Sequence, residues 1–147
     1  MPLLKVWVHA VWSTQQRKPT LIQSIRPIVF SHMIENGRKK GLLIDRINGH
    51  IDHVHMLFAL TNDQPISKVI QLVKGESSHW INQRNLMSSK FEWQDEYYAA
   101  SVSESSLNAV QLYIDHQEEH HKQGTFVQEY EHVMQSFTSD GKRAPLD

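Results

Sequence analysis

The sequence contains no cysteine among its 147 residues. A disulfide scaffold, a zinc ribbon and a thiol nucleophile are therefore excluded. The sequence also lacks an apolar run near the roughly 20 residues that span a membrane. Its N-terminus does not show the basic-then-apolar order of a signal peptide. We therefore expect a cytoplasmic protein with no membrane partner.

A large excess of charge is also missing, because the formal net charge is only −1. This total argues at first against a nucleic-acid partner, but the charges are unevenly distributed. The first 75 residues carry ten Lys/Arg against four Asp/Glu, whereas the remaining residues carry five against twelve. Such a split is typical either of a basic binding face backed by an acidic helix or of uneven scatter over a solvated surface.

The length and a hydrophobic share of 39% fit one compact domain over residues 1–147, with a frayed tail from about residue 139. Alternating apolar residues predict strands, and apolar residues at helical spacing predict helices. The candidate N-caps of the first two helices are Ser24 and Asp63. The predicted elements are a strand over 3–12, a helix from about 24, a hairpin of strands over 42–49 and 53–60, a helix from about 63 to 81, a strand over 91–102 and a helix over 107–121.

The order β-α-β-β-α-β followed by a helix is that of the ferredoxin-like, or split βαβ, fold. We therefore expect the α+β class, with an antiparallel sheet, helices on one face and a C-terminal helix that carries Tyr113. This fold supports many functions, so it does not by itself indicate one.

The pair His53 and His55 is the first candidate site. Side chains alternate between the two faces of a strand, so we expect both imidazoles on one face and Val54 in the core. Two neighbouring imidazoles can share one divalent metal ion, which then needs a third ligand and open positions for a substrate oxygen. Two exposed histidines that bond only to backbone would give the same pattern.

The second candidate site is a face of the last predicted helix. At about 100° per residue, Tyr113, Gln117 and His120 fall within about 60° of one another. An apolar stripe beside them is expected to pack on the sheet, and it consists of Leu107, Val110 and Ile114. A tyrosine hydroxyl with a pKa near 10 is a poor nucleophile at neutral pH. Next to a metal-bound phosphodiester it can form an ester that retains the energy of the broken bond. A half-buried tyrosine beside solvated polar residues remains the structural alternative.

The motifs together resemble the HUH single-tyrosine transposases of the insertion sequence 200/605 group, over about residues 3–131. The two-histidine motif appears in Asp52-His53-Val54-His55, and the tyrosine-helix motif appears in Tyr113-Ile114-Asp115-His116-Gln117 followed by Glu119-His120-His121. Further matches lie between these motifs in the same order: Lys74-Gly75-Glu76-Ser77-Ser78, Trp93-Gln94 and Ser101-Val102-Ser103.

The resemblance implies that Tyr113 attacks a scissile phosphate, forms a 5′-phosphotyrosine link and frees a 3′-hydroxyl, without ATP. It implies a divalent metal, Mg²⁺ or Mn²⁺, held by His53, His55 and Gln117, with His120 as an alternative third ligand. The implied substrate is single-stranded DNA folded into hairpins at the ends of a small mobile element, in the nucleoid of a prokaryote. We expect a homodimer in which the tyrosine helix of one chain completes the histidine pair of the other.

The basic half of the sequence supplies the candidates for DNA contact. They are Arg17, Lys18, Arg38, Lys39, Lys40, Lys74 and Gly75, the glycine because it would let a DNA backbone come close. The three basic residues 38–40 also fit a favourable interaction with a helix C-terminus, which requires no DNA.

One segment departs from the family pattern. Where relatives commonly read Gly-Tyr-Gly-Ala-Phe, this sequence has Glu96-Tyr97-Tyr98-Ala99-Ala100. Two alternatives to the transposase therefore remain: a non-catalytic nucleic-acid-binding module of the same fold, and a histidine-metal phosphodiesterase in which water attacks. Of the ten histidines, His9 and His32 are among those to which the sequence assigns no role.

Overall fold

The computed structural model describes residues 6–121, with side chains up to residue 119. The beginning of the predicted first strand and the predicted frayed tail lie outside this range. The elements, in chain order, are β1 (Trp7–Ser13), η1 (Gln15–Arg17), α1 (Arg26–Lys39), β2 (Leu43–Gly49), β3 (His53–Ala59), α2 (Ile66–Gln83), β4 (Tyr98–Val102), η2 (Glu104–Ser106), α3 (Leu107–Asp115) and α4 (Gln117–His121).

The four strands form one antiparallel sheet in the order β2-β3-β1-β4. The two central strands pair along their whole length, from Trp7 opposite Ala59 to Ser13 opposite His53. Helix α1 connects β1 to β2, and α2 connects β3 to β4. This arrangement is that of the split βαβ fold, so the predicted α+β, ferredoxin-like class is confirmed.

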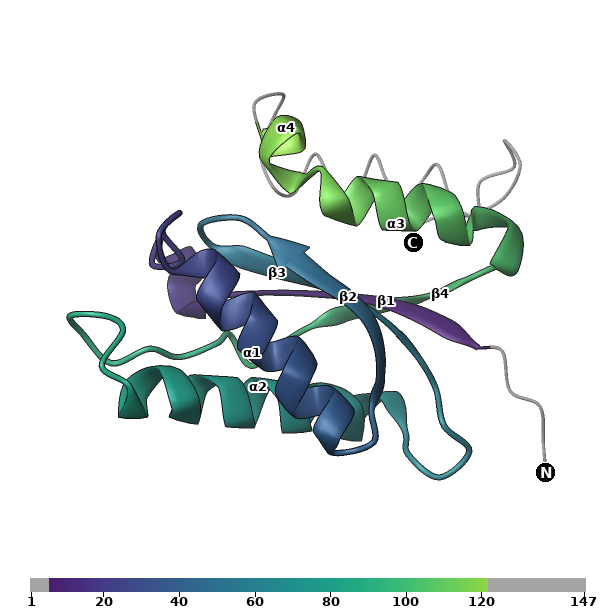
Figure 1. Ribbon diagram of the computed structural model, residues 1–147, viewed down its shortest axis with the longest axis horizontal. Coiled ribbons are helices and arrows are strands. Elements are labelled where there is room, and N and C mark those ends of the chain that lie inside the picture. Colours follow the sequence, from purple (N-terminus) through teal and green to yellow (C-terminus); the bar gives the residue numbers. More distant parts are fainter. Residues whose placement is uncertain (1–5, 122–147) are drawn as a thin grey trace.

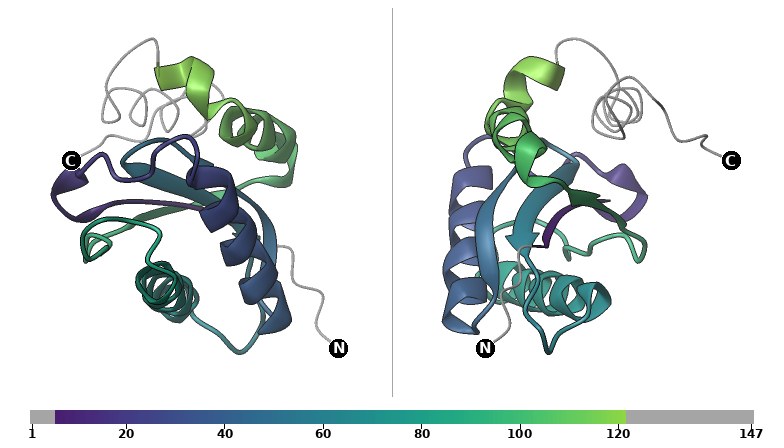
Figure 2. Two further views of the ribbon diagram at one scale, coloured as in Figure 1. Left: turned by 60° about the vertical axis from the view of Figure 1, so that its left-hand side comes forward. Right: turned by 90° about the vertical axis from the view of Figure 1, so that its right-hand side faces the viewer.

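Helices cover both faces of the sheet (Figures 1 and 2). Helices α1 and α2 lie on one face, and α3 with α4 lies over the other. Strand β3 is therefore enclosed on both sides, and residues 53–58 are all buried. A strand in this position carries polar groups at a cost unless each has a partner, so the two histidines at its start are an exception that requires an explanation.

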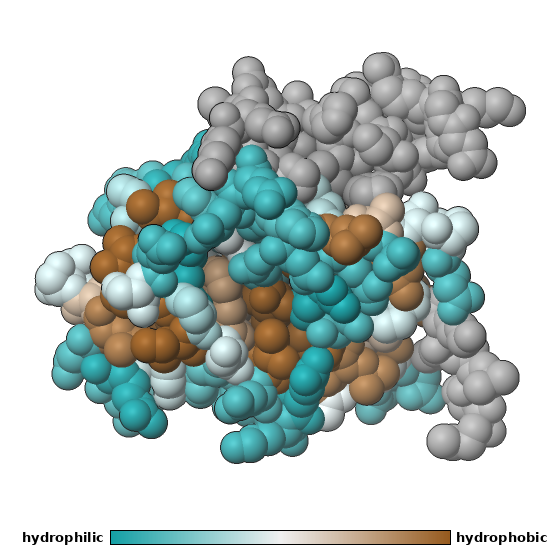
Figure 3. Space-filling model, turned by 45° about the horizontal axis from the view of Figure 1, so that its top comes forward, coloured by the Kyte–Doolittle hydropathy of each residue, from teal (hydrophilic) through white to brown (hydrophobic). Residues whose placement is uncertain are grey.

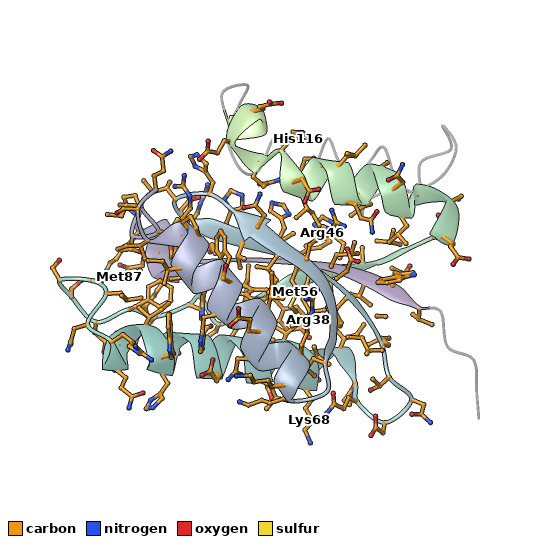
Figure 4. The ribbon with its side chains drawn as sticks, in the orientation of Figure 1. Arg38, Arg46, Met56, Lys68, Met87 and His116 are labelled. Carbon is orange, nitrogen blue, oxygen red and sulfur yellow. The ribbon has the colours of Figure 1, made fainter. Side chains whose placement is uncertain are left out.

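The larger core lies between the sheet and helices α1 and α2. Val54, Met56 and Phe58 point into it from β3 and are at most 1% exposed, and Met56 lies between the sheet and these helices in Figure 4. The indole of Trp93 also packs into this core, and its Nε1–H donates to the buried Ser77 hydroxyl at 2.9 Å. This core fixes the orientation of β3, because every second residue of the strand is anchored in it.

The smaller core lies between the sheet and α3. Val110 and Ile114 are fully buried, Leu107 packs beside them, and all three lie against Leu57 and Val102 of the sheet. The predicted apolar stripe of this helix is therefore confirmed.

The surface is mixed in character. Figure 3 shows hydrophilic residues next to apolar patches on the face that is turned toward the viewer. None of the helices in residues 6–121 has both the length and the apolar content to cross a membrane.

Several predicted boundaries are wrong. Neither Ser24 nor Asp63 caps a helix, because α1 has Ile25 as its N-cap residue and α2 has Pro65. A separate turn precedes α1, where the Ile22 carbonyl accepts from the N–H groups of Ile25 and Arg26. Pro65 has an extended backbone (φ −72°, ψ 159°), so α2 begins only after it.

The fourth strand is shorter than predicted. It begins at Tyr98, and the preceding residues meet the sheet only through an isolated bridge between Trp93 and Thr14. Exposed residues 94–97 form a loop, and the Lys74 ammonium donates to the carbonyl of Asp95 in this loop at 2.9 Å. Hydrogen bonds from the Lys74 side chain therefore hold this loop, in place of backbone pairing with the sheet.

Candidate functional site

The two histidines of β3 lie on the face of the sheet that α3 covers. Val54 is between them and points into the opposite core, as the alternation of the strand predicts. The ring centroids of His53 and His55 are 5.1 Å apart, and the two residues are 0% and 1% exposed. The pair is therefore not a pair of surface histidines.

Helices α3 and α4 bring the two helical candidates to this pair. The ring of Tyr113 is centred 5.4 Å from that of His55, in an edge-on arrangement. The Gln117 carboxamide oxygen Oε1 is 3.2 Å from His53 Nε2. Tyr113 is 7% exposed and Gln117 is 0% exposed. Four side chains that are distant in the sequence therefore meet in one buried cluster.

The single long helix predicted over 107–121 is wrong, because the helix is interrupted at His116 (φ −107°, ψ 36°). Figure 4 shows His116 at the junction between α3 and α4. Across this break, Gln117 Nε2 donates to the Tyr113 carbonyl at 3.2 Å. That bond turns Oε1 of the same amide toward His53. The side chain of His120, the alternative third ligand, lies outside the described residues.

Two residues to which the sequence assigned no role of their own hold the imidazoles. Asp52 Oδ1 accepts from His53 Nδ1 at 2.9 Å. His9, on β1, brings its Nε2 to 2.9 Å from His55 Nδ1, with the two rings stacked 5.2 Å apart. Partners of this type fix the orientation and the tautomer of imidazole ligands in metal sites. The signal in the sequence was weak: Asp52 simply precedes His53, and His9 is a polar residue in an otherwise apolar strand.

Burial and charge set the protonation of these two partners. Burial lowers the pKa of His9 to about 4, so its imidazole is neutral at pH 7. Burial alone would raise the pKa of Asp52, but the hydrogen bond and charge of His53, together with Arg17 at 3.2 Å, outweigh it and place the pKa below its usual value. Asp52 is therefore a carboxylate that can accept the His53 N–H.

The cluster has the donor types that a divalent metal accepts. Imidazole suits first-row transition metals, and an amide oxygen suits harder ions such as Mg²⁺ and Mn²⁺. His53 Nε2 and Gln117 Oε1 lie 3.2 Å apart, so both atoms would be able to reach one ion. Among the described side chains, which end at residue 119, no group of three His, Cys, Asp or Glu residues is arranged for a metal. Gln117 is therefore the third protein ligand that the described part of the chain offers beside the two histidines.

Polar contacts fasten the tyrosine helix to the rest of the chain. The Arg46 guanidinium on β2 lies between the sheet and α3 (Figure 4) and pairs with Asp115 at 2.6 Å. The Asn48 amide donates to the Ile114 carbonyl at 2.8 Å. Arg26 of α1 pairs with Glu118 of α4 at 2.9 Å. Tyr113 is therefore held against the histidines of its own chain.

The predicted DNA-contact residues do not form one surface. Arg17 and Lys18 are exposed in the turn after β1, and Arg17 reaches Asp52 beside His53. Residues 38–40 end α1, next to the start of β2 and so at the opposite end of the sheet from His53. There the Arg38 guanidinium donates to the carbonyls of Ile44 and Asp45 at 3.0 and 3.1 Å.

The last two candidates lie on α2, on the face of the sheet away from α3. Lys74 binds the loop before β4, and burial lowers its pKa. Gly75 is exposed, and a side chain added there would meet nothing within 4 Å. The glycine is therefore not required by packing.

A ferredoxin-like domain with two strand histidines facing a helical tyrosine and amide defines a narrow class of protein. Residues 3–117 match the family model described as transposase IS200 like. The chain therefore belongs to the IS200-like transposases.

A curated relative is the ISDra2 transposase TnpA of Deinococcus radiodurans, which is 24% identical over 114 residues, covering 74% of this chain and 81% of that protein. Two solved structures share the fold. One is a chain from Deinococcus radiodurans R1 described as a transposase, with a TM-score of 0.63 at 20% identity over 80% of this chain and 95% of that one. The other is a REP-associated tyrosine transposase bound to a REP hairpin, with a TM-score of 0.56 at 13% identity over 80% of this chain and 67% of that one.

Proposed function

We propose that this transposase cleaves and rejoins single-stranded DNA with hairpin-forming ends through a covalent 5′-phosphotyrosine intermediate on Tyr113. The observation that carries the proposal is the convergence of Tyr113 and Gln117 on the two β3 histidines, 5.4 Å and 3.2 Å away. Family membership supplies the reaction class, and the cluster supplies a nucleophile with polar groups around it.

In the proposed step, the Tyr113 hydroxyl oxygen forms a bond to the scissile phosphorus as the bond to the 3′-oxygen breaks. The phenol loses its proton, and the departing 3′-oxygen takes one up to become a hydroxyl. The phosphotyrosine keeps the energy of the broken phosphodiester, so a second 3′-hydroxyl can reverse the step without ATP. A nucleophile that remains attached to the DNA suits strand exchange rather than digestion.

His53, His55 and Gln117 would hold a Mg²⁺ or Mn²⁺ ion. Such an ion would polarise the phosphoryl oxygens and stabilise the leaving oxygen. Asp52 and His9 act on the imidazoles, because each engages an Nδ1 atom and so directs Nε2 toward the metal position. Asp52 and His9 are therefore positioning residues in this proposal.

The proposed DNA partner is single-stranded and hairpin-forming, in keeping with the REP hairpin in one structural neighbour. Arg17 and Lys18 lie nearest the cluster and are the residues we propose for phosphate contact. A homodimer is also part of the proposal. The tyrosine helix of one chain already completes that chain's own cluster. Whether a dimer shares its sites is tested by mixing a Tyr113→Phe chain with a His53→Ala chain. Activity returns only if the two chains of a dimer exchange their tyrosine helices.

The central test uses the whole chain, Mn²⁺ and labelled single-stranded oligonucleotides that contain any short imperfect palindromes found in the DNA flanking the gene. We expect a labelled adduct that survives SDS and is absent from Tyr113→Phe. Tyr97→Phe is the matched control, because it removes the hydroxyl of an exposed tyrosine outside the cluster and keeps the aromatic ring. An adduct in Tyr113→Phe would refute the assignment of Tyr113 as the nucleophile. Cleavage without an adduct would favour attack by water, and binding without cleavage would favour a non-catalytic module.

A further inference from the structure

A cavity of about 540 Å³ lies at the β4 edge of the sheet, beside the candidate site. Its volume falls in the range of roughly 300–1,000 Å³ that is usual for small-ligand sites. It is built from the end of β1, the turn that follows and the loop leading into β4. We call it the Tyr98 cavity, and its lining includes the rings of Tyr97 and Tyr98, the Gln94 amide, the Arg17 guanidinium and the Glu96 carboxylate.

Strand register places this cavity in line with the histidine cluster. Val11 on β1 pairs with Tyr98 on one side and with His55 on the other. Directly paired residues of antiparallel strands point to the same face, so Tyr98, Val11 and His55 form one row. Neighbouring strands are about 4.8 Å apart, so the backbones of Tyr98 and His55 are separated by roughly 10 Å across the sheet. A DNA strand whose scissile phosphate lies at the histidine cluster would place a neighbouring nucleotide at this cavity.

The chemistry of the cavity suits an unpaired base. Tyr98 and Tyr97 are 48% and 39% exposed, and an exposed aromatic ring is the usual platform for stacking single-stranded bases. The Gln94 amide on the cavity wall can both donate to and accept from a base edge. Arg17 adds a positive charge that attracts a phosphate.

The turn that carries Arg17 is strained. Gln16 and Arg17 both have left-handed backbones, with φ of 55° and 53°, although neither is glycine. The Gln16 N–H donates to Gln94 Oε1 at 3.3 Å, and the Arg17 guanidinium reaches Asp52. Strained residues of this kind cluster at ligand clamps and persist only where the surrounding structure holds them. Through Asp52, this turn connects the cavity to His53.

Tyr98 is the residue of the aromatic wall that departs from the family pattern given above. The family pattern has glycine at the position of Tyr98 and phenylalanine at the position of Ala100. Ala100 pairs with His9 and Tyr98 pairs with Val11, so both positions lie on the same face of β4. The Tyr98 ring therefore lies on that face at the start of β4, two residues from the position that pairs with His9.

We propose that the Tyr98 cavity binds an unpaired nucleobase of the single-stranded DNA that flanks the scissile phosphate, by stacking on Tyr98 with Arg17 on the adjoining phosphate. This inference rests on the proposed function, since it needs a single-stranded substrate at the histidine cluster. The base is selected mainly by its π-face, so the cavity contributes affinity and register more than recognition of one base.

The test is a binding cycle on the full chain in the Tyr113→Phe background, which prevents cleavage. The probe is a labelled DNA hairpin with unpaired flanks taken from the palindromes beside the gene, and a set of copies carries one abasic position each. We expect Tyr98→Ala to weaken binding about tenfold. At one position, removal of the base should weaken binding to the Tyr98 chain by about the same factor. The same removal should not weaken binding to Tyr98→Ala any further. Tyr98→Phe keeps the ring and should keep the affinity.

Leu43→Ala is the matched control, because Leu43 is similarly exposed on the opposite edge strand. The cavity proposal would be overturned if the Tyr98 and Tyr98→Ala chains bound the probe equally well. It would also be overturned if the losses of affinity from Tyr98→Ala and from each abasic position simply added up. The adduct assay separates this failure from failure of the proposed function. A Tyr98→Ala protein that still forms the adduct leaves the proposed function intact, whatever its affinity for the probes. If the unaltered chain forms no adduct, the proposed function itself is refuted.

Discussion

Acid should destabilise this protein through His9, and the size of the effect can be worked out from the structure. The imidazole is 1% exposed, and burial lowers its pKa to about 4 from an ordinary value of 6.5. Below about pH 6.5 the unfolded chain therefore binds a proton at this position that the folded chain does not. The stability contributed by neutral His9 is complete above pH 6.5 and is lost as the pH falls toward 4.

For these two pKa values the loss between pH 7 and pH 5 is about 2 kcal/mol. His50 also has a lowered pKa, caused first by burial and then by the charge of Arg26, so the unaltered chain loses more than this in total. The contribution of His9 is isolated by comparison with His9→Gln, which keeps a polar side chain and cannot titrate.

The assay is urea unfolding at pH 7 and pH 5 in EDTA, so that metal binding does not contribute. We expect the fall in unfolding free energy to be about 2 kcal/mol smaller in His9→Gln, whatever its stability at pH 7. An NMR titration of the His9 ring in the unaltered chain gives the folded pKa directly. Equal pH dependence in the two chains, or a His9 pKa near 6.5, would refute the reasoning.

Three substitutions test the packing around the site. In Gly49→Ala the new methyl group would collide with the backbone carbonyl of His53, so we expect a loss of about 1–3 kcal/mol in urea unfolding, and an unchanged midpoint would contradict this. Asn48→Ala removes the hydrogen bond to the Ile114 carbonyl and should lower the unfolding free energy by about 1 kcal/mol. Amide exchange in α3 should become faster, and unaltered exchange would show that the bond does not hold the helix. Ser77→Ala leaves the buried Trp93 N–H without its acceptor and should lower the unfolding free energy by about 1–3 kcal/mol, a result that a neutral substitution would disprove.

The order of elements could be predicted because each strand and helix carries its own apolar period. The boundaries could not be predicted equally well. Pro65 takes an extended backbone and delays α2, and exposed residues before Tyr98 bond to Lys74 rather than to the sheet. These outcomes depend on partners far along the chain, which a local pattern does not contain.

The candidate site shows the same division. The shared face of His53 and His55 follows from strand alternation alone. The approach of Tyr113 was expected only through the family resemblance, since no local rule brings residues 58 positions apart together. The role of His9 requires the register of β1 against β3, and Arg38 could not be distinguished from a DNA contact until its carbonyl partners were known. The metal, the nucleophile and the DNA contacts remain predictions.

The fastening of the tyrosine helix has a consequence for how ionic strength affects the reaction. The four clustered side chains are at most 7% exposed, so under the proposed function we expect α3 and α4 to shift before a phosphate reaches them. Added salt screens the ion pairs of Asp115 and Glu118 and eases that shift, but it also weakens the attraction between DNA and Arg17. Salt thus acts on two successive steps in opposite directions, and the rate of cleavage should pass through a maximum at an intermediate ionic strength.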